Sequence, residues 1–377
     1  MISVNKIDIL VIGGGPAGMT AALKAAENGA SVIIIEKYHE LGGQLIKQTH
    51  RFFGSKEEQA GIRGIKIAEE LTKKIKNHTK IEVLTEATAQ GYYEDKVVTV
   101  SYQDEFIKIK PKKVIIATGA SEKMLAFENN DLPGVYGAGA VQTLMNLYGI
   151  LPGQKVVMVG AGNIGLIVSY QLLQAGVEVA AVIEAAPKIG GYLVHASKIR
   201  RAKVPIYTSH SIKKAIGEKS VEAVEMVKLD ENWNMVEGSE QIIKADTVCL
   251  AVGLRPLADL LIQAECEMAY IPELGGDVPL RDENLKTTND HIFVAGDAAG
   301  IEEATAAMLE GELAGLKAVS EIGYSNSQLF EELNRLKNEL NKLRNGPVGK
   351  VIRKGLKKAR GKEDAGKNRY SHIRGYR

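Results

Sequence analysis

The sequence is poor in the residues that sulfur-based chemistry requires. Only two cysteines, Cys249 and Cys266, occur in 377 residues, and they form no paired motif. This spacing excludes a cysteine-rich metal or iron–sulfur site within the chain, and such low cysteine usage is typical of a reducing compartment. We therefore expect no metal site and a cytoplasmic location. Cys249 lies in an apolar strand pattern and is expected in the core.

Long apolar runs are also missing. The first one, Ile7–Ile12, is only six residues long and ends in glycines, which argues against a signal peptide. No run approaches the length needed to cross a bilayer, so we expect no membrane span.

Net charge is small, at +2, but it is unevenly distributed. From Val348 to Arg377 there are eleven lysines and arginines against two carboxylates, a local charge of +9 that leaves the preceding body near −7. A basic segment on an acidic body is typical of docking. This run carries glycines and no aromatic ladder, so we expect an acidic partner surface and no nucleic acid.

What the sequence does contain is a glycine-rich turn between two apolar segments. Ile7–Ile12 predicts a strand, a helical pattern extends from Ala17 to about Asn28, and Val32–Ile35 predicts a second strand that ends in Glu36. The turn follows the pattern G-x-G-x-x-G and includes Gly13, Gly15, Pro16, Ala17 and Gly18. Such a unit binds a dinucleotide: the glycines admit the pyrophosphate, the helix N-terminus attracts it, and the acid accepts ribose hydroxyls. The alternative is a βαβ unit whose glycines only make a turn.

A second copy of this pattern follows. Lys155–Val159 predicts a strand, Leu166–Ala175 a helix, and Glu178–Ile183 a strand that ends in Glu184. The turn again has the same spacing, with Gly160, Gly162, Asn163, Ile164 and Gly165. The duplication indicates two nucleotide sites; the alternative is two βαβ units without ligands.

The remaining pattern completes an α/β chain. We expect helices at Glu57–Lys76 and Glu302–Ile322 and a connector at Leu132–Gly139. We also expect a meander of strands whose last strand is Phe106–Ile109 and which ends at Pro111. Further strands are predicted at Ile81–Leu84, Glu86–Tyr93, Lys96–Tyr102, Val114–Ile116, Pro205–Thr208, Ile212–Ile216, Val221–Leu229, Asp246–Val252 and Ile292–Ala295.

These elements predict two Rossmann-like three-layer nucleotide-binding domains, the second inserted in the first, and a helical basic tail. The expected segments are 1–122 and 255–323 for the first domain, 123–254 for the second with its connector, and 324–377 for the tail.

Leucines recur in that tail at a spacing of 4-3-4-3, at Leu329, Leu333, Leu336, Leu340 and Leu343. Two heptads are too short to be stable alone. This leucine seam either packs on the chain's own body or pairs with a partner or a second copy as a homo-oligomer.

Five motifs stand in a specific order: the two glycine turns with their acids, Ala117-Thr118-Gly119, Val252–Pro256, and Thr288 followed by Phe293–Asp297. Together they resemble the flavoprotein family typified by thioredoxin reductase and glutathione reductase. The resemblance implies that the first unit binds FAD and the second a nicotinamide nucleotide. The implied FAD residues are Gly13, Gly15, Pro16, Ala17, Gly18, Glu36, Lys37, Gly43, Gln44, Ala87, Thr118, Gly119, Gly296, Asp297 and Thr305. The implied NAD residues are Gly160, Gly162, Asn163, Ile164, Gly165, Glu184 and Gly253.

The chain departs from disulfide reductases of that family, because neither Leu41–Lys47 nor Gly160–Ile189 contains the cysteine pair that relays electrons. Leu132–Leu151, the Gly-Gly-Gln loop and Gly275–Thr288 look most like the alpha subunits of heteromeric amine and amino-acid dehydrogenases, such as opine oxidase, hydrogen cyanide synthase, sarcosine oxidase and dye-linked proline dehydrogenase. Many such subunits continue into a cysteine-rich cluster domain, where this chain has the leucine seam and basic tail.

The implied chemistry is hydride transfer between nicotinamide C4 and flavin N5, which needs positioning more than an acid or base. No residue is assigned as catalytic. His195 and Lys198 are candidates for the nicotinamide entry, and Lys47 and His50 for flavin N5 or a substrate carboxylate; a surface role is the alternative for all four. Glu184 predicts NAD(H) over NADP(H), because a carboxylate repels a 2′-phosphate.

Three functions stay open from the sequence. The first is a subunit of a multi-subunit dehydrogenase that exchanges electrons with a partner dehydrogenase or iron–sulfur subunit. The second is a self-contained NADH oxidase or ferredoxin-type reductase. The third is a non-catalytic subunit that binds FAD and an adenine nucleotide.

Overall fold

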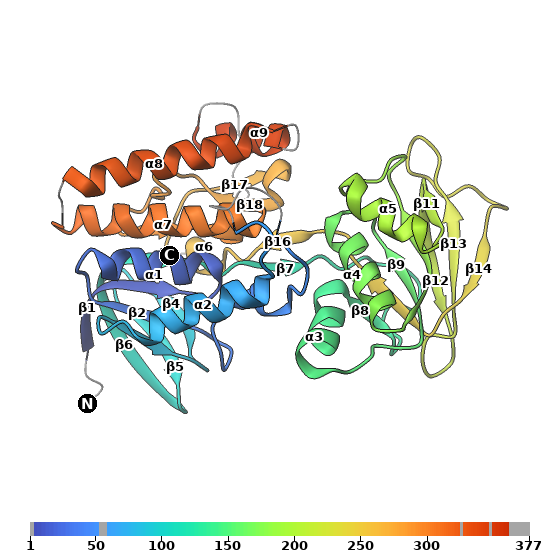
Figure 1. The fold of residues 1–377 in the computed structure, drawn as a ribbon, viewed down its shortest axis with the longest axis horizontal. Coiled ribbons are helices and arrows are strands. Elements are labelled where there is room, and N and C mark those ends of the chain that lie inside the picture. The colour runs from blue at the N-terminus through green and yellow to red at the C-terminus, as the bar shows by residue number, and fades with distance from the viewer. Residues whose placement is uncertain (1–3, 53–58, 325–326, 347–348, 362–377) are drawn as a thin grey trace, which may run out of the picture. The chain divides into compact units, whose positions relative to one another are not determined.

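The computed structural model describes residues 4–52, 59–324, 327–346 and 349–361, which divide into two compact units (Figure 1). Unit 1 consists of Met1–Ser121 and Arg255–Arg377, and unit 2 of Glu122–Leu254. The two connecting segments form short strands, β7 (Ala120–Glu122) and β16 (Leu254–Pro256), that pair with each other.

A parallel sheet forms the centre of unit 1. Its strands are, in spatial order, β3 (Ile81–Leu84), β2 (Val32–Ile35), β1 (Val4–Ile12), β6 (Glu105–Ile116) and β19 (Ile292–Val294). All four residues of β2 are buried, as expected for a parallel strand with both faces covered. The antiparallel strands β4 (Thr88–Tyr92) and β5 (Val98–Tyr102) extend the sheet from the first half of β6.

The expected break at Pro111 is wrong, because β6 continues through it. The first half of β6 pairs with β5 up to Ile109, and its second half pairs with β19 from Val114 onward. Pro111 lies in the gap between these two partners, where the N–H that proline lacks is not needed by a neighbouring strand on that side. On the other side β1 runs alongside without interruption, with Ile7 opposite Pro111.

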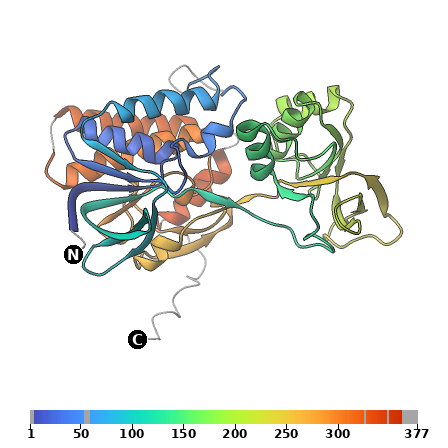
Figure 2. The same ribbon diagram turned by 90° about the horizontal axis from the view of Figure 1, so that it is seen from below.

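Helices α1 (Pro16–Glu27), α2 (Gly64–Lys76) and α7 (Ala304–Glu321) cover one face of this sheet, and Figure 2 shows them in blue and orange. The short helix α6 (Asp259–Gln263) packs on the opposite face. The predicted helix Glu57–Lys76 is wrong in its first part, because Gln59 and Gly61 have φ values of 63° and 82°, outside the helical range. Residues 57 and 58 lie outside the described residues.

Two C-terminal helices, α8 (Ser327–Arg344) and α9 (Gly349–Ala359), lie over α7 and the loops beside it (Figure 1). Leu329, Leu336 and Leu340 of the leucine seam are at most 4% exposed and belong to the core of unit 1. The seam therefore packs on the chain's own body, and the alternative of a homo-oligomer formed through it is wrong. α9 packs on β17 (Met268–Ile271) and on the short helix η2 (Pro272–Leu274) that precedes β18 (Gly276–Pro279).

Unit 2 contains a parallel sheet of β11 (Ile206–Thr208), β10 (Glu178–Glu184), β9 (Lys155–Val159), β15 (Thr247–Leu250) and β8 (Val135–Gly137). Its helices are α3 (Ala138–Tyr148), α4 (Asn163–Gln174) and α5 (Leu193–Arg201). A separate antiparallel sheet consists of β12 (His210–Ile216), β13 (Ala223–Lys228) and β14 (Gln241–Lys244). The expected connector Leu132–Gly139 is instead part of the core fold, because it supplies β8 and the start of α3.

The α/β class with two Rossmann-like sheets is thus confirmed. None of the described helices is both long and apolar enough to cross a membrane. Cys249 is fully buried in β15, as its apolar context predicts.

The closest helix pair in unit 1 is α1 with α7, and glycines set its spacing. A Cβ atom on Gly311 would overlap the Ala17 carbonyl oxygen, and one on Gly315 would overlap that of Ala21. Because those neighbours are backbone atoms of a helix that also forms the first glycine turn, they have little room to move.

We therefore expect Gly311→Ala to lower the free energy of unfolding by about 2 kcal/mol despite the better helix propensity of alanine. Chemical denaturation measures this loss. Gly346→Ala, where a Cβ atom would meet nothing within 4 Å, is the control. If the two variants had equal free energies of unfolding, α1 and α7 could move apart without loss of stability.

Candidate dinucleotide sites

The first glycine turn joins β1 to α1 in a conformation that larger residues cannot adopt. Gly13 has a φ of 109°, and a Cβ atom there would overlap the carbonyl oxygen of Ala117. A Cβ atom on Gly18 would overlap the carbonyl oxygen of Gly13. Gly15 precedes Pro16 at the start of α1, and among the described residues no N-cap side chain accepts a hydrogen bond from the first N–H groups of this helix.

Glu36 lies against this turn at the end of β2. Its Oε2 accepts a hydrogen bond from the Gly14 N–H at 2.7 Å, and its Oε1 accepts one from the Tyr38 N–H at 2.9 Å. Ala87, another predicted residue, donates from its backbone N–H to the Glu36 carbonyl at 3.0 Å. Each carboxylate oxygen keeps one lone-pair direction, so the side chain is oriented and still able to accept hydroxyl groups.

The loop after Glu36 returns to the same turn. Gly42 donates from its N–H to the Gly14 carbonyl at 2.8 Å, and a Cβ atom on Gly43 would lie 2.8 Å from the Gly15 Cα. Gln44 follows in the short helix η1 (Gly43–Lys47) and is exposed. Lys37 is exposed too, with its Nζ 4.8 Å from the Tyr38 ring centroid, so it lies on the outer side of the loop.

Strand β19 leads into Gly296 and Asp297, a second acid close to the first glycine turn. Gly296, with a φ of 69°, packs on Ala17, since a Cβ atom at Gly296 would be 2.9 Å from that of Ala17. Burial raises the pKa of the adjacent Asp297 to about 6. Asp297 accepts a long hydrogen bond of 3.4 Å from the Glu302 N–H, and the buried Thr305 follows in the first turn of α7.

Thr118 and Gly119 lie where the chain leaves unit 1. The Thr118 hydroxyl donates to the Leu257 carbonyl at 2.7 Å, and the Gly119 carbonyl accepts from the Leu257 N–H at 2.9 Å. Gly119 has a φ of 75° and open space around its Cα. These contacts tie the outgoing segment to the returning one.

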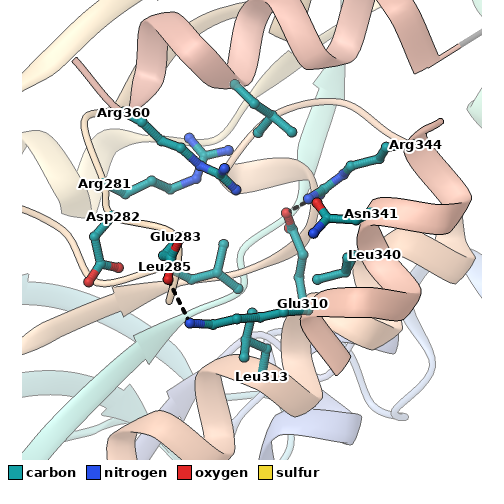
Figure 3. Close-up of a pocket in the computed structure, with 12 residues that line it drawn as sticks. Arg281, Asp282, Glu283, Leu285, Glu310, Leu313, Leu340, Asn341, Arg344 and Arg360 are labelled. Carbon is teal, nitrogen blue, oxygen red and sulfur yellow. Dashed lines mark hydrogen bonds and ion pairs between the residues drawn. The ribbon is translucent and has the colours of Figure 1, made fainter. Parts of the chain in front are cut away.

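A cluster of buried charged residues, Glu302, Glu310 and Arg344, is hydrogen-bonded to the Gly296–Asp297 turn. The Gly296 N–H donates to Glu310 Oε2 at 3.0 Å. Arg344 of α8 donates to the other oxygen of Glu310 at 2.6 Å (Figure 3). Arg344 also donates to both oxygens of Glu302, at 2.6 and 2.9 Å. Burial alone would lower the pKa of Arg344, but Glu310 and Glu302 outweigh it and raise that pKa.

Neither Glu310 nor Arg344 is predicted from the sequence. Arg344 ends the leucine seam, but nothing in the heptad spacing indicates that it reaches α7. A glutamate among the small residues of α7, followed directly by Gly311, is the one local signal that could have drawn attention to Glu310.

The second glycine turn repeats the first in unit 2. Gly160 has a φ of 108°, and a Cβ atom on Gly165 would overlap the Gly160 carbonyl oxygen. Glu184 accepts from the Ala161 N–H at 2.7 Å and from the Ala186 N–H at 2.9 Å, the same two positions that Glu36 uses. Around Gly162 a Cβ atom would meet nothing within 4 Å, so the turn has an open face.

Three further predicted residues surround this second turn. Asn163 Oδ1 accepts from the Tyr192 N–H at 2.8 Å and so ties the turn to the start of α5, whereas Ile164 is 41% exposed. Gly253 has a φ of 118°, which a residue with a Cβ atom rarely adopts.

The four candidate reactive residues lie at various depths. His195 is 6% exposed, so a solvated helix face is wrong for it, and its ring lies 6.2 Å from that of Tyr192. Lys198 Nζ lies 5.0 Å from the Tyr170 ring centroid. Lys47 and His50 are half-buried, and the His50 ring stacks on Phe52 with centroids 6.0 Å apart. Whether any of the four contacts a substrate stays a prediction.

Both units thus combine a glycine turn with a carboxylate hydrogen-bonded to it. A family model described as pyridine nucleotide-disulphide oxidoreductase matches residues 7–311. The chain belongs to this family. The family's flavoproteins bind FAD and are oxidoreductases, so the resemblance to two-nucleotide flavoproteins is confirmed.

Comparison with individual members gives more detail. The chain is 30% identical over 350 residues to an opine oxidase subunit from Agrobacterium tumefaciens (strain Ach5), covering 85% of this chain and 67% of that one. The structure of L-proline dehydrogenase from P. horikoshii superposes with a TM-score of 0.68 at 27% identity over 89% of this chain and 60% of that one. T. acidophilum thioredoxin reductase, with a TM-score of 0.68, 22% identity and coverage of 84% and 99%, shares the fold.

The resemblance to subunits of heteromeric oxidases is confirmed by the opine oxidase match. The chain spans about two thirds of the length of that subunit and 60% of the proline dehydrogenase chain. The activity, substrates and partners of those whole proteins therefore apply to this chain only as proposals.

Replacing Arg344 tests the ion cluster. Arg344→Met would leave Glu302 and Glu310 buried without a cation, and we expect a loss of about 3–5 kcal/mol in the free energy of unfolding near neutral pH. Burial already raises the pKa of Glu302, and removing the cation raises it further. Because a raised carboxyl pKa favours the folded state at low pH, the deficit should shrink from about pH 8 to about pH 5.

Urea denaturation at several pH values measures this difference. Arg335→Met is the matched control, because Arg335 lies on the same helix but pairs at the surface, with a side chain 50% exposed. A surface pair contributes about 1 kcal/mol or less. If Arg344→Met lost little free energy of unfolding, and equally at every pH, Arg344 would not stabilise the charges of Glu302 and Glu310.

Proposed function

We propose that this chain is an FAD-dependent, NAD(H)-linked oxidoreductase subunit that passes electrons between a nicotinamide nucleotide and a partner protein. The observation that carries the proposal is the repeated pairing of a glycine turn with an oriented carboxylate, Glu36 in unit 1 and Glu184 in unit 2. Two such turns in one chain are suited to two dinucleotides.

In the proposed FAD site, the N–H groups at the start of α1 bind the pyrophosphate, and Glu36 accepts the adenosine ribose hydroxyls. Gly43 and Gln44 line the flavin side, with Lys37 and Ala87 near the adenosine end. Asp297 holds the ribityl chain, and Thr118 and Gly119 approach the flavin. The N-terminus of α7 at Thr305 faces the pyrimidine edge, where the helix dipole stabilises negative charge.

In the proposed NAD site, Gly160, Gly162 and Gly165 admit the pyrophosphate, Asn163 and Ile164 begin the helix that receives it, and Gly253 borders the nucleotide. Glu184 accepts the ribose 2′-hydroxyl and repels a 2′-phosphate. Bound FAD would supply N5 as the acceptor of the nicotinamide hydride, and the chain contributes positioning and exclusion of water.

Disulfide reduction is not part of the proposal. Cys249 and Cys266 are both buried, they belong to different units, and burial raises the pKa of each thiol. A thiol with a raised pKa is a poor nucleophile, and neither cysteine is paired for relay. Electrons on the flavin therefore need an acceptor outside the described chain, and the relatives named as oxidase subunits support a partner subunit. We propose that this partner is a dehydrogenase or an iron–sulfur subunit.

Anaerobic titration with NADH tests whether the proposed FAD and NAD sites work together. We expect one equivalent of NADH to remove the visible absorbance of the bound flavin, and stopped-flow reduction by NADPH to be slower by at least about tenfold, because Glu184 repels the 2′-phosphate. Glu184→Gln should narrow that ratio, whereas Glu178→Gln, an exposed acid at the start of the same strand, should not. Failure of NADH to reduce the flavin, with a bound adenine nucleotide, would favour a non-catalytic subunit.

Turnover with and without partners tests the electron route. We expect protein purified from its native source to carry other chains, identified by mass, and the separated chain to be reduced by NADH but to reoxidise slowly in air. A separated chain that is fully active with oxygen or ferredoxin would instead indicate a self-contained NADH oxidase or ferredoxin-type reductase.

A further inference from the structure

A cavity of about 50 Å³ lies in unit 1 between the loop after β18, α7, α8 and the end of α9 (Figure 3). Its lining is rich in cations: Arg281 comes from the loop, Lys337 and Arg344 from α8, and Arg360 from the residue after α9. In Figure 3 the guanidinium groups of Arg281 and Arg360 point into the cavity from one side, and Arg344 approaches from the other.

Arg281 is the most buried of these cations and has one weak acceptor. Its side chain is buried, with the residue 5% exposed, and its one hydrogen bond within the described chain goes from Nη1 to the Pro279 carbonyl at 3.3 Å. Burial lowers the pKa of Arg281 to about 10, with Arg344 and Arg360 adding to the effect against Glu310, so it is still protonated at neutral pH. A buried guanidinium with one weak acceptor is unfavourable unless an anion or another acceptor completes it.

The carboxylates around the cavity are already engaged. Glu310 and Glu302 share Arg344, and Glu283 pairs with Lys337 at 2.8 Å. Asp282 accepts hydrogen bonds from backbone N–H groups of its own loop, at 2.8 and 3.0 Å, and points away from the cavity in Figure 3. Of the cations, Arg281 and Arg344 are buried and Arg360 is half-buried. Glu310 and Glu302 pair with Arg344, and no described carboxylate forms an ion pair with Arg281 or Arg360.

Arg360 adds a second guanidinium without an ion pair among the described residues. Burial, the largest effect, and the nearby Arg344 lower the pKa of Arg360, whereas Glu283, Glu310 and Asp282 act in the opposite direction. The Arg281 N–H donates to the Ala359 carbonyl at 3.0 Å, so the backbone fixes Arg281 beside the end of α9. Two guanidinium groups are thus held at the wall of one cavity, and an anion between them would relieve their mutual repulsion.

We propose that this cavity binds a small oxyanion between Arg281 and Arg360. Guanidinium groups bind phosphate and carboxylate oxygens in pairs, and two of them from different elements suit a tetrahedral phosphate or sulfate group better than a planar carboxylate. The volume admits such a group but no whole nucleotide, so this site is separate from the two glycine turns. The bound anion would hold α9 to the loop after β18.

Thermal unfolding of the full chain, loaded with FAD, tests this site. We expect inorganic phosphate or sulfate to raise Tm along a saturable curve, by about 3–6 °C at 100 times Kd, and chloride of equal ionic strength to have a smaller, non-saturating effect. Isothermal titration should give one anion per chain. Acetate distinguishes a carboxylate ligand from a phosphate or sulfate ligand. If acetate raised Tm and phosphate did not, the site would be supported and its ligand would be a carboxylate.

Variants distinguish this cavity from the glycine turns, which also attract phosphate. Arg281→Met should match or exceed the Tm of the parent chain in phosphate-free buffer, because it removes a buried guanidinium group that has one weak acceptor, and should lose the response to phosphate. Arg360→Met, at the half-buried end of α9, should also lose that response and is the reserve if Arg281→Met fails to fold. Arg335→Met is the control and should respond as the parent does.

Two results would overturn the proposal. One is a Tm that none of the three anions changes beyond the effect of chloride. The other is an unchanged phosphate response in both Arg281→Met and Arg360→Met, which would assign the bound phosphate to the glycine turns.

Discussion

Each of the two glycine-turn βαβ units of this chain depends on one hydrogen bond, from a backbone N–H of the glycine turn to the carboxylate that ends the next strand. Glu36 accepts from Gly14, and Glu184 accepts from Ala161, both at 2.7 Å. The bond joins the two ends of a βαβ unit and orients an acid beside the first turn of a helix. A Cβ atom at position 13 or 160 would overlap a backbone carbonyl group, so replacing either glycine would disrupt its turn.

In unit 1 a second interaction extends this arrangement to the C-terminal helices. Arg344 of α8 neutralises Glu302 and Glu310, and Glu310 in turn accepts from the Gly296 N–H. The turn that carries Asp297 is thus supported by a helix that lies outside the βαβ pattern. Arg281 and Arg360 line a cavity beside α8, and neither forms an ion pair with a described carboxylate.

Local patterns predicted the strands and glycine turns well, because each depends on residues within about thirty positions of one another. The errors arose where distant segments decide the outcome. Pro111 is tolerated inside β6 because β5 and β19 end and begin on either side of it. The leucine seam packs on α7 of its own chain because that surface is present in unit 1, which heptad spacing alone does not reveal.

The sequence by itself determined the α/β class, the duplicated glycine turns with Glu36 and Glu184, and the lack of a cysteine pair. These follow from spacing, since a tight turn requires glycine at fixed positions whatever lies around it. Only the tertiary structure decided that Arg344 and Glu310 support the Gly296 turn and that Arg281 and Arg360 share a cavity. Their effect depends on burial, which strengthens electrostatic interactions between residues far apart in the chain and leaves no local pattern.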